Sequence, residues 1–280
     1  MDLRTTPFNG RVAHVSLKGQ IEADRFVEGE LMRVVYSIAD FFRAPHGARD
    51  RQLLSGQAFR VLDIQDEWAF GFSEYDGYCG WILYQALLAT EHTTHRVWTR
   101  ESFWRAEPEL KYDALDSPKY LGSEVRVFQT TGDWSCIGPD QYMPSVHLKR
   151  IEDFETDTVA VARRLLGAPY VWGGNSARGI DCSGLVQAAF RACGISCPGD
   201  SDLQMNMAGI ALDAGDPLQP GDLLFWKGHV AMATGPDAMI HANAHHMAVV
   251  EEAIEPALAR ISATDTGPIT LRLRPSLPTG

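Results

Sequence analysis

One cysteine in the chain stands where a nucleophile could be activated. Cys182 follows the glycine-rich segment GAPYVWGGNSARGID and opens the apolar run CSGLVQAAF, which has the spacing of a helix. A thiol attacks only as the thiolate, and a free cysteine with a pKa of about 8.5 is mostly protonated at neutral pH. The unpaired backbone N–H groups and positive dipole end of a helix N-terminus stabilise an anion. The position of Cys182 therefore predicts a reactive thiol.

A nucleophilic thiol also needs a base, and a third group must hold that base in the right tautomer. His229 opens an expected strand, HVAMAT, and His241 follows in AMIHAN after a turn at GPD. Two such strands can be antiparallel neighbours, with both imidazoles facing the helix that carries the cysteine. The sequence thus predicts Cys182 as nucleophile, His229 as base and His241 as the group that orients the base.

A metal site is the competing interpretation of these residue types. His241, His245 and His246 form a histidine-rich tract, and Cys193 and Cys197 are two thiols close in sequence. No HExxH motif and no second cysteine pair supports zinc, so no metal ligand is predicted. Cys193 is instead expected to be a small apolar residue buried by its helix.

Composition argues against several classes of partner. Acidic residues outnumber basic ones by 36 to 25, and the resulting charge of −11 should repel nucleic acid. No apolar stretch approaches the roughly eighteen residues of a membrane-spanning helix, and the N-terminus does not resemble a secretory signal. An odd number of cysteines, five in 280 residues, does not resemble a disulfide framework. We therefore expect a cytoplasmic protein without nucleic-acid or membrane partners.

Two helices and several strands are expected to position the candidate residues. TDTVAVARRLLGAPY predicts a helix that is capped by Thr156 or Asp157 and ends before Gly167. A second helix is predicted to begin at Cys182 or Ser183 and to end at Gly194. Strands are expected at DLLFW, HVAMAT, AMIHAN and ITLRLR, so this part of the chain is predicted to be α+β.

The first half of the chain has an all-β pattern. Short alternating segments such as QAFRVLD, WAFGF and YCGWI are separated by polar turns. A second stretch repeats the same landmarks about 65 residues later, with LGSEVRVF matching LSGQAFRVL and Trp134 matching Trp68. Two units of that size, each with a tight glycine turn and a tryptophan expected in the core, predict two small SH3-like barrels.

Four motifs follow one another in the last part of the chain: PYVWGGNSARGIDCSGLV, PGDLLFW, GHVAMAT and MIHAN. In order and spacing they resemble the NlpC/p60 family of papain-like cysteine peptidases. The resemblance implies that Cys182, His229 and His241 are catalytic and that no cofactor is required. It also implies that Tyr170 helps the Cys182 backbone N–H to stabilise the oxyanion. HVAMATG departs from the family pattern, because many relatives carry glycine directly after the histidine and valine. This difference affects the expected shape of the pocket and not the expected chemistry.

With two SH3-like units before this domain, the chain resembles the γ-D-glutamyl-L-diamino acid endopeptidases of the dipeptidyl-peptidase VI type. By that resemblance Asp181 would meet the substrate's ammonium, Ser183 and Ser201 would line the pocket, and Tyr78 would reach the substrate from the first barrel. An acid from the first barrel is also expected, with Asp50 as the candidate. Structural roles stay open, because Asp181 and Ser183 could cap the helix and Tyr78 could be barrel core.

These observations predict an α+β chain with a segment at 1–28, SH3-like barrels at 29–88 and 89–150, and a papain-like α+β catalytic domain at 151–280. We expect a cysteine endopeptidase that hydrolyses the γ-D-glutamyl–diamino acid bond of a small murein peptide with a free N-terminal L-Ala. Three alternatives stay open: a peptidoglycan-binding protein with an inert third domain, a zinc hydrolase, and an amidase or acyltransferase of the same fold.

Overall fold

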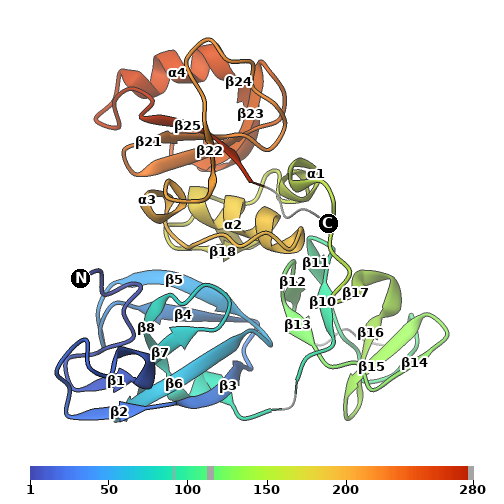
Figure 1. Ribbon diagram of the computed structural model, residues 1–280. Coiled ribbons are helices and arrows are strands. Elements are labelled where there is room, and N and C mark those ends of the chain that lie inside the picture. The colour runs from blue at the N-terminus through green and yellow to red at the C-terminus, as the bar shows by residue number, and fades with distance from the viewer. Residues whose placement is uncertain (91, 112–116, 277–280) are drawn as a thin grey trace. The chain divides into compact units, whose positions relative to one another are not determined.

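The computed structural model describes residues 1–90, 92–111 and 117–276. The chain forms two compact units, Met1–Glu152 and Asp153–Gly280 (Figure 1). Strands dominate the first unit and the second combines a sheet with helices, so the predicted α+β class is confirmed. Within these described ranges, no helix has the length and apolar character that crossing a membrane requires.

The largest sheet of the first unit has seven antiparallel strands in the order β5-β4-β8-β7-β6-β3-β9. They are β3 (Glu30–Val34), β4 (Ile38–Phe42), β5 (Arg49–Leu54), β6 (Ala58–Gln65), β7 (Trp68–Ser73), β8 (Cys79–Leu83) and β9 (Leu87–Leu88). Upstream, β1 (Val12–His14) and β2 (Arg25–Val27) pair in parallel. Phe41, Phe59 and Trp68 are buried, so the prediction for Trp68 is confirmed.

A second group of strands completes the first unit in three small sheets. They are β10 (His95–Val97), β13 (Glu124–Val125) and β17 (Leu148–Arg150); β11 (Glu101–Ser102) and β12 (Lys119–Tyr120); and β14 (Gln129–Thr131), β15 (Trp134–Gly138) and β16 (Gln141–Pro144). Val97, Val125 and Met143 form a core. Trp134, predicted to lie in the core, is only partly buried, because alternation along β15 turns its neighbour Ser135 inward instead.

A turn after β5 ties the two groups of strands together. The Ser55 carbonyl accepts a 2.8 Å hydrogen bond from the Glu124 backbone N–H, and the buried Lys119 ammonium donates to the Ser55 hydroxyl at 2.7 Å. Gly56 has a φ of +78°, and a Cβ there would overlap the carbonyl oxygen of Glu124. Only glycine therefore fits this turn without moving the backbone.

The second unit is built on a six-stranded antiparallel sheet in the order β20-β25-β21-β22-β23-β24. The strands are β20 (Gly209–Ala211), β21 (Leu223–Trp226), β22 (His229–Ala233), β23 (Ala238–Asn243), β24 (Ala248–Ala253) and β25 (Leu271–Pro275). A short hairpin, β18 (Asn175–Ser176) with β19 (Gly179–Ile180), precedes the second helix. All four predicted strand segments are present, because their apolar residues suit a sheet that is covered on both faces.

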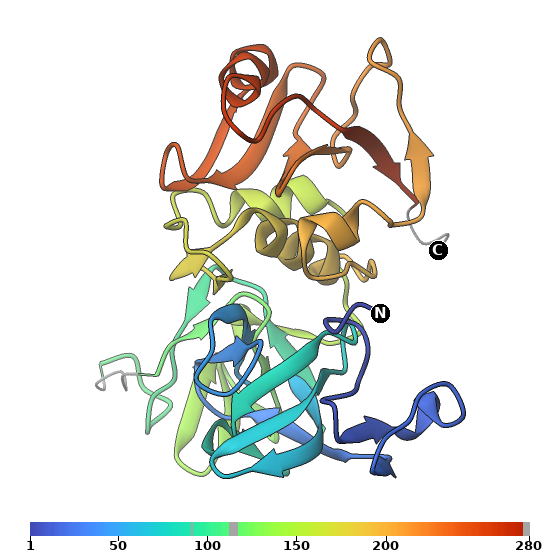
Figure 2. The same cartoon turned by 90° about the vertical axis from the view of Figure 1, so that its left-hand side faces the viewer.

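The helices lie on opposite faces of this sheet, as two perpendicular views agree (Figures 1 and 2). They are α1 (Thr158–Arg163), α2 (Cys182–Ala192) and α3 (Ser201–Gln204) on one face and α4 (Ile254–Ser262) on the other. The Asp157 side chain caps α1 through the Ala160 N–H at 2.9 Å, and α2 begins at the predicted cysteine. Both predicted helices are confirmed.

Candidate active site

Cys182 is the first residue of α2, and the residue before it holds the start of this helix in place. The Asp181 carboxylate accepts hydrogen bonds from the Gly184 backbone N–H at 2.7 Å and from the Ser183 hydroxyl at 3.0 Å. Its other oxygen accepts from the Gly173 backbone N–H at 2.9 Å. Asp181 thus joins the glycine-rich turn to the helix N-terminus, and the capping role that the sequence left open is present.

The thiol is buried, and its surroundings act on it in two directions. Burial, and to a smaller extent the neighbouring Asp181 carboxylate, raise the pKa of Cys182 to about 12. The backbone N–H groups of Val230, Ser183 and Cys182 hydrogen-bond the sulfur and lower its pKa. The helix N-terminus therefore acts as predicted, but burial and the carboxylate outweigh it. The Val230 contact also brings the sulfur to the residue that follows His229.

The two candidate histidines lie on neighbouring strands and contact each other. His229 begins β22 and His241 lies in β23, and these strands pair antiparallel through Ala233 and Met239. The His229 Nε2 atom lies 2.8 Å from the His241 Nδ1 atom. Strand alternation puts both rings on the sheet face of Ala233 and Met239, and the Cys182 sulfur reaches the start of β22 at the Val230 N–H, directly after His229. That both rings face the helix of the cysteine stays a prediction.

Both imidazoles are held in the neutral form. Burial lowers the pKa of His229 to about 3, with smaller contributions from His241 and Arg260. Burial also lowers the pKa of His241, although the Glu252 carboxylate acts in the opposite direction. The resting site therefore contains a neutral thiol and neutral imidazoles at neutral pH.

Glu252 and Arg260 extend the site beyond the residues that the sequence pointed to. The His241 Nε2 atom lies 2.7 Å from Glu252 Oε1, and the Arg260 guanidinium donates to both oxygens of Glu252, at 2.6 and 2.9 Å. These contacts lower the pKa of Glu252 to about 2, with the Arg260 hydrogen bond as the largest cause. The segment AVVEEA could have indicated an acid beside the histidines, because strand alternation places one of its two glutamates on each face of the sheet.

Tyr170 lies in the loop before the β18–β19 hairpin, near the cysteine. Its backbone N–H donates to the Met247 carbonyl at 2.9 Å, and it forms an isolated bridge with Ile180. Burial raises the pKa of its hydroxyl, and the charges of Cys182 and Asp181 raise it further. The hydroxyl is therefore a protonated hydrogen-bond donor within electrostatic reach of the thiol.

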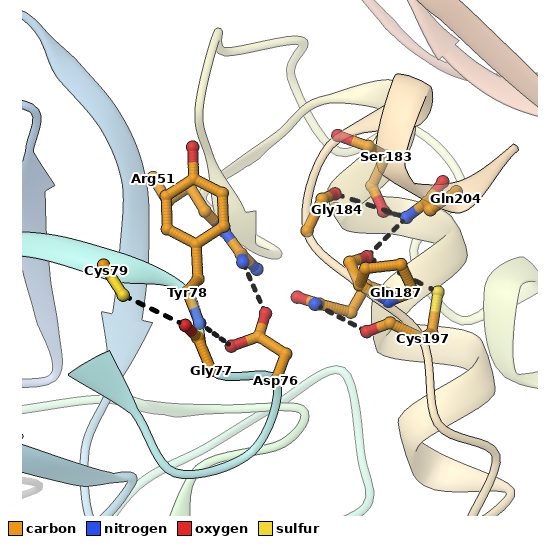
Figure 3. A network of polar contacts seen from close by, with 12 residues as sticks. Arg51, Asp76, Gly77, Tyr78, Cys79, Ser183, Gly184, Gln187, Cys197 and Gln204 are labelled. Atoms are coloured by element: carbon orange, nitrogen blue, oxygen red, sulfur yellow. Dashed lines mark hydrogen bonds and ion pairs between the residues drawn. The ribbon is translucent and has the colours of Figure 1, made fainter. Parts of the chain in front are cut away.

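Ser201 begins α3, and a buried glutamine holds this helix against the first turn of α2 (Figure 3). The Gln204 Nε2 atom lies 2.9 Å from the Ser183 carbonyl oxygen, 3.0 Å from that of Pro198 and 3.3 Å from that of Gly199. Gln204 is fully buried. One side chain thus connects the loop before Ser201 to the helix of the cysteine, a connection that the sequence analysis did not identify.

Tyr78 and Asp50 belong to the first unit. The Tyr78 side chain is buried, with the Arg51 guanidinium 4.7 Å from the centre of its ring (Figure 3). Arg51 forms a buried ion pair with Asp76 at 2.5 Å. Asp50 pairs with Arg43 at 2.7 Å. The position of Tyr78 is that of a barrel-core residue, and its predicted contact with substrate stays a prediction.

The histidine-rich tract has no metal-site geometry. In the described part of the chain, no group of three or more His, Cys, Asp or Glu side chains is arranged to hold a metal ion. His246 instead contacts the Asn243 side chain oxygen, through its backbone N–H at 2.8 Å and its Nδ1 atom at 3.1 Å. Cys193, expected to be buried, is only partly so, because it lies at the end of α2.

Comparison with known proteins agrees with this geometry. Residues 167–260 match the NlpC/P60 family, and residues 41–87 match the bacterial dipeptidyl-peptidase Sh3 domain. A Bacillus cereus γ-D-glutamyl-L-lysine dipeptidyl-peptidase is 40% identical over 94 residues, which cover 31% of this chain and only 28% of that protein. Dipeptidyl-peptidase 6 of Lysinibacillus sphaericus is 24% identical over 75% of this chain and 86% of its own length. The γ-D-glutamyl-L-lysine dipeptidyl-peptidase of Bacillus subtilis is 29% identical over 68% of this chain and 71% of its own.

A solved structure supports the fold. The crystal structure of an NlpC/P60 family protein from Bacillus cereus superposes with a TM-score of 0.72, at 20% identity, over 88% of this chain and 99% of that one. The SH3 match covers residues 41–87, so an SH3-like barrel at 89–150 stays a prediction. Residues 167–260 thus form an NlpC/P60 domain, residues 41–87 form a bacterial dipeptidyl-peptidase SH3 domain, and the site around Cys182 is that of a cysteine peptidase.

Proposed function

We propose that this protein hydrolyses the γ-D-glutamyl–diamino acid bond of small murein peptides that begin with a free L-Ala. One observation carries the proposal: the Cys182, His229 and His241 side chains lie in an NlpC/P60 domain that follows a dipeptidyl-peptidase SH3 domain. Two relatives similar over most of their length are named dipeptidyl-peptidases, and one of these names specifies γ-D-glutamyl-L-lysine. The site geometry supports attack on a carbonyl carbon by a thiol.

The reaction follows from the roles of three side chains. The Cys182 sulfur attacks the γ-carbonyl carbon of D-Glu while His229 takes the thiol proton, and His241 orients His229. The Cys182 backbone N–H and the Tyr170 hydroxyl donate to the oxyanion. His229 then gives its proton to the departing amine of the diamino acid, which leaves a γ-glutamyl thioester. Water, deprotonated by His229, hydrolyses the thioester and releases L-Ala-D-Glu.

Asp181 connects recognition of the substrate amine with activation of the thiol. Its carboxylate raises the pKa of Cys182, which disfavours the thiolate in the free enzyme. An N-terminal ammonium bound beside Asp181 offsets this negative charge and so makes the thiolate easier to form. A peptide with a blocked amine would lose both the ion pair and this assistance.

We also propose that the reaction takes place in the cytoplasm, in the degradation or recycling of murein peptides. All five cysteines lie in the described ranges, and none of them forms a disulfide bond there. Free thiols suit a reducing compartment, where small unlinked peptides rather than the assembled wall would be the substrates.

Turnover of a tripeptide tests the function. L-Ala-γ-D-Glu-diaminopimelate, its L-Lys counterpart and an N-acetylated copy of each would be incubated with the protein, and the products identified by mass. We expect release of L-Ala-D-Glu from the free peptides and a loss of about 100-fold or more in kcat/KM for the acetylated ones. Equal rates for free and blocked peptides would refute the ammonium site. Products that carry a transferred acyl group would indicate an acyltransferase instead.

A further inference from the structure

The two histidines are connected to an ion pair, Glu252 with Arg260, that has no role in the steps of the proposed reaction. Three side chains are connected in series: His229 Nε2 to His241 Nδ1 at 2.8 Å, and His241 Nε2 to Glu252 Oε1 at 2.7 Å. Arg260 closes the series, because its guanidinium donates to both oxygens of Glu252. The outer end of the series is therefore a fixed carboxylate.

The fold places Glu252 at this end through strand register. In the β23–β24 pair, Met239 lies opposite Glu252 and His241 lies opposite Val250. Glu252 is thus two residues from the partner of His241 and shares its face of the sheet. Arg260 comes from α4, which begins directly after β24. The adjacent acid, Glu251, points to the other face and pairs there with Arg163 at 2.6 Å.

Two neutral imidazoles in contact can share their hydrogen bond in either direction. In one direction His229 donates through Nε2–H and keeps a lone pair on Nδ1, so it can accept a proton from the thiol. In the other direction His241 donates, and the proton of His229 occupies Nδ1. His229 then cannot act as a base. The contact between the two rings does not by itself choose between these states.

The carboxylate makes this choice. An ionised carboxylate only accepts hydrogen bonds, so its contact with His241 requires a proton on Nε2 of that ring. Neutral His241 then has a lone pair on Nδ1 and must accept from His229 Nε2–H. We propose that Glu252 is a positioning residue that selects the tautomers of His241 and His229, so that Nδ1 of His229 stays unprotonated.

This inference rests on the proposed thiol chemistry, and it explains why the proton can move from the thiol to His229. When His229 takes the thiol proton, both of its nitrogens carry hydrogen, and no hydrogen bond in the series has to reverse. The negative charge of Glu252 also stabilises the imidazolium through His241. Among the residues that the structure describes, the charged and titratable groups that face His241 are Glu252, Arg260, His229 and His246, and Glu252 is the one acid in this set.

Nitrogen NMR of the unmutated protein tests the tautomers directly. Histidine labelled with 15N distinguishes protonated from unprotonated ring nitrogens, and His229→Gln and His241→Gln variants assign the two residues. At neutral pH we expect both rings to carry their proton on Nε2. A proton on Nδ1 of neutral His229 would overturn the proposal.

Alkylation of Cys182 by iodoacetamide gives a second test, with a matched control. Removal of the charge in Glu252→Gln should lower the alkylation rate in the neutral pH plateau by about tenfold, because the imidazolium that accompanies the thiolate loses its counter-ion. The alkaline limit, where hydroxide ionises the thiol without the histidine, should stay unchanged. Glu251→Gln removes the same charge from the same strand on the other face, and it should change neither region.

Two results of the alkylation experiment would contradict the proposal. One is a Glu252→Gln plateau equal to that of Glu251→Gln. The other is an equal fall in the plateau and the alkaline limit, which would mean that Glu252 only maintains the structure. Because alkylation needs no peptide, failure of the tripeptide assay with the expected alkylation and NMR results would refute the substrate and leave this inference standing.

Discussion

The Nε2 atom of His229 lies 2.8 Å from the Nδ1 atom of His241. This contact occupies one nitrogen of each ring, so Nδ1 of His229 is the nitrogen left to exchange a proton with the thiol. The same contact connects His229 to Glu252, because His241 is itself hydrogen-bonded to that carboxylate. Burial keeps both rings neutral at rest, with the pKa of His229 lowered to about 3. With both rings neutral at rest, the proposed attack requires transfer of the thiol proton to His229.

Replacement of Cys182 by alanine should abolish peptide cleavage, because no other group on α2 can form the thioester. We expect kcat to fall by at least about 10³-fold, as for removal of other catalytic nucleophiles, with the fold unchanged by circular dichroism. Cys193→Ala, at the other end of the same helix, is the control and should retain activity. Turnover in Cys182→Ala at a rate close to that of the unmutated protein would exclude the proposed mechanism.

Asp181→Asn should change thiol reactivity and peptide turnover in opposite directions. The carboxylate raises the pKa of Cys182, so its removal lowers that pKa and should speed alkylation by iodoacetamide by several-fold. Peptide kcat/KM should fall by about 100-fold because the substrate ammonium loses its partner. Asn can still cap the helix, which limits structural damage.

The matched control for this change is Asp157→Asn. Asp157 caps α1 in the same unit and does not contribute to the pKa of Cys182. It should leave both alkylation and turnover near the wild-type values. If alkylation and turnover fell together in Asp181→Asn, the electrostatic role assigned to Asp181 would be wrong.

Lys119 should make the stability of the first unit depend on alkaline pH. Burial lowers the pKa of Lys119 to about 8, whereas the unfolded chain has an ordinary value of about 10.4. Below the lower value the folded state bears the full cost of the buried charge, roughly 3 kcal/mol. Between these values the unfolded state binds more protons, so the free energy of unfolding should rise with pH.

The comparison protein for this measurement is Lys119→Met. In urea unfolding at pH 7 to 10 it should lack the contribution of Lys119, so the difference in unfolding free energy between the two proteins should shrink as pH rises. A difference that stays constant over this range would show that the ammonium is not destabilised by burial.

Gly56→Ala should destabilise the first unit, because a Cβ at this position meets the Glu124 carbonyl oxygen. We expect a loss of about 2 to 4 kcal/mol in unfolding free energy, from the displaced backbone and the positive φ together. Gly77→Ala also introduces a side chain at positive φ, +69°, but nothing lies within 4 Å of the added atom. It should cost about 1 kcal/mol. Equal losses of unfolding free energy in Gly56→Ala and Gly77→Ala would mean that the turn after β5, with its contact to Glu124, does not hold the two groups of strands together.

Local signals in the sequence were sufficient to predict the elements that carry the chemistry. Asp157 and Asp181 precede helices that begin where capping predicts, and alternation in HVAMAT and AMIHAN predicts strands that form. These features succeed because a cap or a strand pattern depends on residues a few positions apart. The same motifs pointed to the NlpC/P60 family, which the comparison supports for residues 167–260.

Strand register and helix placement depend on the whole domain. They decided which residues lie around the histidines and which side chains point into the core. AVVEEA offers two acids, and only the pairing of β24 with β23 puts Glu252 rather than Glu251 beside His241. The sequence likewise gives no sign that Arg260 closes this series or that β15 turns Ser135 inward in place of Trp134. The sequence by itself determined the candidate nucleophile, the two candidate histidines and the local elements. The tertiary structure decided which charges surround them, because contacts between residues distant in sequence exist only after the sheet has assembled.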